Sequence, residues 1–110
     1  MNQPAHSDNS NGSVVLRLSG EYDISRKDEL NAALSAAYNA TEAILDVRDV
    51  SYIDSTAIEC LIRLRKRMSE NGSSLIRLVG PTRQVRKVLQ LTGLHQVFEL
   101  SETSEDVPLG

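Results

Sequence analysis

The fold is decided by residues 50–59, which read Val50-Ser51-Tyr52-Ile53-Asp54-Ser55-Thr56-Ala57-Ile58-Glu59. This stretch is expected to contain the apolar end of a strand, then a short polar turn, and then the start of a helix. Thr56 and Glu59 have the spacing of a capping box, in which a hydroxyl accepts from a helix N–H and a glutamate reaches back. Spacing alone therefore favours Thr56 as a cap. A hydroxyl at a helix start can also carry a phosphate, because unpaired N–H groups and the positive dipole end lie there.

The helix that follows, at about residues 56–70, has the clearest periodicity in the chain. One arc of its surface is apolar and the opposite arc is charged; the apolar arc holds Ala57, Cys60, Leu61, Leu64 and Met68. Ile58 and Ile62 fall at one margin of this arc, next to Arg65 and Ser69. That margin is either the edge of the core, with Arg65 extending to solvent, or an apolar ledge beside Ser55 that a partner could cover.

Strand-like and helix-like segments alternate through the rest of the chain. Strands are expected at residues 14–18, 43–47, 75–79 and 96–100. The helices between them are expected to begin at Ser25, Thr56 and Thr82. The order β-α-β-α-β-α-β predicts an α/β fold with a largely parallel sheet and right-handed crossovers.

Composition limits the classes of function. The chain has 110 residues and a net charge of −3, which indicates one globular domain and gives no reason to expect nucleic acid as a partner. A single cysteine, Cys60, fits a reducing compartment, and no apolar run predicts membrane insertion. We expect a cytoplasmic protein. Residues 1–12 are expected to form a mobile tail or a weak edge strand, with a hairpin signal at Asn11-Gly12, and residues 101–110 a frayed tail.

Catalytic and cofactor motifs are weak throughout. A nucleophilic Ser55 would need a base, and His95 is the only histidine in a region expected to be ordered. The chain has no nucleophile-elbow pattern, no phosphate-binding glycine loop and no Cys/His/carboxylate cluster with metal-ligand spacing. We therefore expect neither an enzyme nor a protein with a metal or cofactor.

Three short motifs together resemble the STAS domain: Gly20-Glu21-Tyr22-Asp23, Asp49-Val50-Ser51-Tyr52-Ile53-Asp54-Ser55-Thr56 and Thr92-Gly93-Leu94. Among STAS domains the chain is most similar to the bacterial anti-sigma factor antagonists. The resemblance covers residues 13–100. It implies a mixed, largely parallel sheet of four to five strands with helices packed on one side, and no catalytic activity.

The resemblance also implies partners and a site. Family members bind an anti-sigma factor that is also a serine kinase of the GHKL type, and so release a sigma factor. The kinase would phosphorylate Ser55, or less readily Thr56, and a serine phosphatase would restore the binding form. The partner-binding surface expected from the motifs and the helix margin comprises Asp23, Asp54, Ser55, Thr56, Ile58 and Ile62.

A second function stays open. Some STAS modules are never phosphorylated and act as subunits that bind a transporter ATPase or another cytoplasmic partner. Ala57 and Glu59 stand where antagonists commonly have glycine or another small residue, which keeps this alternative in view.

Overall fold

The computed structural model describes residues 6–10 and 12–102; the parts of the two expected tails at 1–5 and 103–110 lie outside this range. The strands are β1 (His6–Ser10), β2 (Ser13–Tyr22), β3 (Glu42–Ile53), β4 (Leu75–Val79) and β5 (Glu99–Ser101). The helices are α1 (Lys27–Leu34), α2 (Ser55–Glu70) and α3 (Arg83–Thr92). Short 3₁₀ turns occur at η1 (Ile24–Arg26), η2 (Ser35–Ala37) and η3 (Leu94–Gln96).

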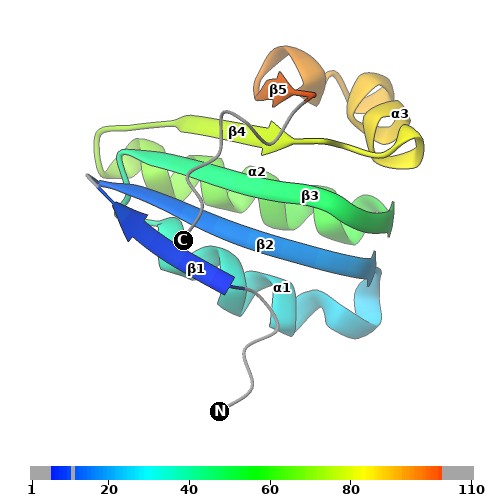
Figure 1. The fold of residues 1–110 in the computed structure, drawn as a ribbon, viewed down its shortest axis with the longest axis horizontal. Helices are drawn as coiled ribbons and strands as arrows, with labels where there is room; N and C mark the ends of the chain where they lie inside the picture. The colour runs from blue at the N-terminus through cyan, green and yellow to red at the C-terminus, as the bar shows by residue number, and fades with distance from the viewer. Residues whose placement is uncertain (1–5, 11, 103–110) are drawn as a thin grey trace.

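The strands form one sheet in the order β1-β2-β3-β4-β5, so neighbours in sequence are neighbours in space. β2 to β5 are parallel, and β1 pairs antiparallel with β2 at one edge. Helices α1 and α2 run behind the sheet, and α3 follows the end of β4 (Figure 1). This arrangement confirms the predicted α/β class with a mixed, largely parallel sheet and helices on one side.

The main core lies between the sheet and the helices. Alternate residues of β2, β3 and β4 face it and are met by the apolar arc of α2, all five of whose predicted members are buried. Ile76, Leu78, Val85 and Leu89 extend the same core toward α3. The opposite face of the sheet carries a smaller buried cluster of Val15, Ile44 and Val79.

Three strands differ in length from the sequence prediction: β2 and β3 are longer, and β5 is shorter. β3 continues to Ile53 because β2 stays paired with it to its end, so no polar turn precedes Asp54. The last strand is shorter than expected: Gly93 takes a left-handed φ of 79°, and residues 94–96 then form the extra turn η3. The N–H of Phe98 bonds to the carbonyl of Leu94 at 3.0 Å, which delays the strand to Glu99.

Candidate functional site

The predicted site lies at the carboxyl ends of β2 and β3. Tyr22 and Ile53 are paired in register at the ends of these parallel strands, and each is followed by an aspartate. The carboxylate of Asp23 accepts from the N–H of Ser25 at 2.9 Å. That of Asp54 accepts from the N–H of Thr56, also at 2.9 Å. Two helical segments therefore start side by side, each capped by an aspartate at an equivalent position.

Two predicted caps are wrong. Asp54, with extended backbone angles, is the cap of α2, and it also accepts from the N–H of Ala57 at 3.3 Å. Thr56 is the second residue inside the helix, so the capping box with Glu59 does not form. Likewise Asp23, rather than Ser25, caps the turn that leads into α1. In both cases the strand is longer than the pattern indicated: β2 ends at Tyr22 instead of residue 18, and β3 at Ile53 instead of residue 47. The first residue after each strand takes the capping position.

Ser55 is the first residue of α2, and its side chain is exposed. Within the described part of the chain its hydroxyl makes no hydrogen bond that would hold it. Ala57 is buried, so its methyl group does not reach the surface around Ser55, whereas Glu59 is exposed one turn along the helix. The hydroxyl is thus open to an enzyme. Asp54 already occupies the two nearby N–H groups that a phosphate would otherwise use.

The start of α3 fixes the strand end in front of Asp54. The side-chain amide of Gln84 accepts from the N–H of Ile53 and donates to its carbonyl, both at 2.9 Å. The hydroxyl of Thr82 donates to the carbonyl of Val50 at 2.9 Å while capping α3. These contacts position the turn that presents Ser55.

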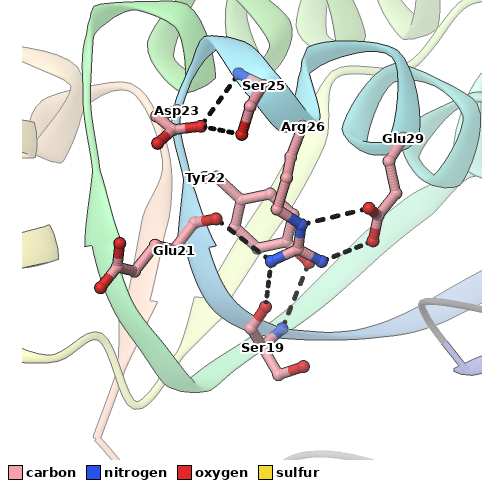
Figure 2. Close-up of polar contacts among 7 residues, drawn as sticks. All are labelled: Ser19, Glu21, Tyr22, Asp23, Ser25, Arg26 and Glu29. Atoms are coloured by element: carbon pink, nitrogen blue, oxygen red, sulfur yellow. Dashed lines mark hydrogen bonds and ion pairs between the residues drawn. The ribbon is translucent and has the colours of Figure 1, made fainter.

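A network around Arg26 holds the loop that carries Asp23 (Figure 2). The Arg26 guanidinium donates to the carbonyls of Ser19 at 2.8 Å and Glu21 at 3.1 Å. It also forms an ion pair with the carboxylate of Glu29. The same group lies over the ring of Tyr22, 4.1 Å from its centroid.

Gly20 and Asp23 complete this loop. Gly20 has a φ of 86°, and a Cβ there would lie 2.9 Å from Arg26 Nη1. Hydrogen bonds from the Ser25 hydroxyl and N–H hold the pKa of Asp23 below its ordinary value, so this carboxylate stays charged at neutral pH.

The two isoleucines predicted to bind a partner lie in different environments. Ile62 is 50% exposed, but Ile58 is only 7% exposed. Ile58 belongs to the core cluster, so little of its side chain is left for a partner to contact. Sequence reasoning missed Ile24, which is 75% exposed directly after Asp23. The available signal was that Ile24 falls outside the apolar stripe of the helix that follows.

The described residues contain no candidate metal centre and no candidate membrane-spanning helix. Within residues 6–10 and 12–102, no group of three or more His, Cys, Asp or Glu side chains is placed to hold a metal ion. In the same part of the chain, no helix combines the length and apolar character needed to cross a bilayer.

Comparison with known proteins agrees with the geometry. The STAS domain family model matches residues 5–107. The Anti-sigma F factor antagonist of Lysinibacillus sphaericus is 32% identical over 74% of this chain and 71% of the relative.

Solved structures share the fold. An anti-sigma-factor antagonist (STAS) domain protein from Planctomyces limnophilus superposes with a TM-score of 0.81 at 18% identity, covering 93% of this chain and 92% of that one. The Bacillus cell fate determinant SpoIIAA in its phosphorylated form gives 0.71 at 22% identity, covering 94% and 96%.

Proposed function

This chain belongs to the STAS domain family, and from that premise we propose that it is an anti-sigma factor antagonist controlled by phosphorylation of Ser55. In this proposal it acts in the cytoplasm as a binding protein rather than an enzyme. It binds an anti-sigma factor that is also a GHKL-type serine kinase, and thereby releases a sigma factor. Phosphorylation of Ser55 ends the binding, and a serine phosphatase restores it.

The observation that carries the proposal is the setting of Ser55. It is exposed, it is the first residue of a sixteen-residue helix, and its hydroxyl has no competing partner in the described residues. Thr56 is half-buried one position further into the helix, so it is the poorer phosphate acceptor. The proposed contact surface consists of Asp23, Asp54, Ser55, Thr56 and Ile62, with Ile24 added and Ile58 removed.

Electrostatics determines the direction of the switch. A phosphoserine adds about −1.5 to −2 charges at neutral pH. Because Asp54 already accepts from the N–H groups of Thr56 and Ala57, the helix start offers the phosphate little compensation. A partner carboxylate about 5 Å away, at an effective dielectric near 20, would be repelled by roughly 5 kcal/mol before salt screening.

Screening reduces this penalty. A residual ~2–3 kcal/mol would weaken binding by about 30- to 150-fold. We therefore expect phosphorylation to turn binding off rather than on.

The test is incubation with the candidate kinase and ATP, followed by mass-spectrometric mapping. Modification should fall on Ser55, disappear in Ser55→Ala and persist in Thr56→Ala. In a binding assay Ser55→Ala should match the wild type, and Ser55→Asp should bind at least about ten-fold more weakly. Ser35→Asp places the same charge on an exposed serine after α1 and should bind like the wild type.

Equal binding by Ser55→Ala, Ser55→Asp and the wild type, together with no modification, would contradict the switch. It would leave the other class of STAS function, a subunit that binds a transporter ATPase without being phosphorylated.

A further inference from the structure

A groove runs beside α2, between its second half and the segment around η3. Ile62, Arg65 and Ser69 form one wall, and Leu94, Val97 and Phe98 form the other. The groove brings together two segments of the chain that are about 30 residues apart, and none of its lining residues takes part in the cap at Asp54.

The groove is apolar at its base and open at its lip. Phe98 is buried at 4% exposure, while Ile62 and Val97 keep 50% and 42% of their surface exposed. Large aliphatic side chains on both walls are thus accessible at one place. A partner that covered them would remove apolar surface from water, which stabilises a complex.

The rim is positively charged on a chain whose net charge is −3. The exposed face of α2 carries four cations, Arg63, Arg65, Lys66 and Arg67, against two carboxylates, Glu59 and Glu70. Within residues 12–102 none of the four cations forms an ion pair. Arg67 lies over the ring of Tyr38, 5.6 Å from its centroid, whereas the charges of Arg65 and Lys66 at the groove are available to carboxylates of another molecule.

The groove lies on the same side of α2 as Ser55. Ser55, Ile62 and Ser69 are spaced by seven residues, which is nearly two helical turns, so they form one line with steps of about 10 Å. A protein that covers Ser55 and follows this line reaches the groove at Ile62.

We propose that this groove binds an acidic amphipathic helix of the anti-sigma factor. The apolar face of that helix would cover Ile62 and Val97, and its carboxylates would face Arg65 and Lys66. Helix-in-groove recognition uses this combination of spaced apolar anchors and a charged rim. Charge complementarity selects an acidic partner over a basic one, and continuity with Ser55 places the groove next to the proposed switch. The choice of the anti-sigma factor as partner rests on the proposed function. The preference of the groove for an acidic amphipathic helix does not depend on that function.

The chemistry is tested on the full chain with a synthetic peptide of about 18 residues that has leucine along one helical face and glutamate on the other. An otherwise identical peptide carries lysine in place of glutamate. In titrations of ¹⁵N-labelled protein, the glutamate peptide should shift the resonances of Ile62, Ser69 and Val97. It should bind at least about ten-fold more tightly than the lysine peptide. Equal binding of both peptides, absence of binding, or shifts confined to other surfaces would overturn the proposal.

Matched variants localise the effect. Ile62→Asp, and the double change Arg65→Glu with Lys66→Glu, should each weaken the glutamate peptide by at least about ten-fold. Leu75→Asp changes an equally exposed aliphatic residue on β4, and Arg83→Glu with Lys87→Glu makes the same charge change on α3. Both controls should bind like the wild type.

The same variants, assayed with the purified anti-sigma factor kinase, separate the two proposals. Both predict weaker binding, one for Ser55→Asp and the other for the double change Arg65→Glu with Lys66→Glu, which lies outside the contact surface proposed around Ser55. If only Ser55→Asp weakens binding, the kinase does not use the groove and the proposed function stands. If only the double change weakens it, the groove stands and the switch at Ser55 fails.

Discussion

The side-chain amide of Gln84 pairs with both backbone groups of Ile53, as a neighbouring strand would, at the point where β3 ends. Gln84 belongs to α3, and Ile53 immediately precedes the cap residue of α2. The first turn of α3 therefore fixes the strand end from which Ser55 is presented.

Replacing Gln84 by alanine should destabilise the protein by about 1–3 kcal/mol, because two half-buried backbone groups lose their partner. Urea unfolding measures this change. Gln90→Ala makes the same substitution at an exposed site in the same helix and should stay within about 0.5 kcal/mol of the wild type. An unchanged stability in Gln84→Ala would show that the pairing contributes nothing.

Removing the Asp54 carboxylate that caps α2 should reduce the free energy of unfolding more than removing the Thr56 hydroxyl does. Asp54→Ala loses the bonds to the N–H groups of Thr56 and Ala57, which is expected to cost about 0.5–2 kcal/mol. Thr56→Ala leaves both bonds in place and should be nearly neutral. Chemical denaturation of the two variants compares them directly, and a larger loss in Thr56→Ala would restore the capping box that the structure rejects.

Arg26→Lys should loosen the loop that carries Asp23. Lysine keeps the charge but cannot reproduce the bonds to Ser19 and Glu21 or the planar contact with Tyr22. We expect a loss of about 1–2 kcal/mol in unfolding free energy. Arg83→Lys, at an exposed position, is the matched control and should be silent. Equal stability of the two variants would count against the network.

Asp46 should stabilise the protein at neutral pH and lose this effect in acid. Asp46 is 5% exposed, and its carboxylate accepts from Arg48 Nε at 2.9 Å. Hydrogen bonds from Arg48 hold the pKa of Asp46 below its ordinary value, and this effect exceeds the opposing one of burial. Because the pKa of Asp46 is lower in the folded protein than in the unfolded chain, ionisation of Asp46 stabilises the folded protein at pH values above the unfolded-state pKa near 4. This stabilisation is lost as the pH falls through the folded-state pKa.

Asp46→Asn should therefore be less stable than the wild type at pH 7, and the difference should shrink below about pH 4. Thermal unfolding between neutral and acid pH tests this, with Asp49→Asn, an exposed change on the same strand, as control. A difference that stays constant over the whole range would exclude the linkage.

Sequence reasoning succeeded for the parts of the fold that depend on a single local pattern of residues. The periodicity of α2 identified five of its six buried residues because a long helix with a continuous apolar arc has one way to be buried. Gly93 ends α3 in the left-handed conformation that glycine adopts most readily. Both features depend on local information only.

The caps and the margin of α2 depended on neighbours that a local pattern does not contain. Asp54, Ser55 and Thr56 can all cap a helix, and the length of β3 determines which one does so. That length follows from pairing with β2 and from Gln84. Burial of Ile58 but not of Ile62 also depends on how closely other elements approach each turn of the helix. The Arg26 network has no sequence signal, because it uses backbone carbonyls placed by the turn at Gly20.

The strand order has a consequence for how the chain is made. Because β2 to β5 follow one another in both sequence and space, each new strand leaving the ribosome finds its neighbour already synthesised. Only one crossover has to close at each step, and no strand must later be inserted between two others. Folding can thus proceed vectorially during translation, with the sheet growing at a single edge. The strand end that presents Ser55 is held by the first turn of α3, so it does not depend on β5, the last strand to be added.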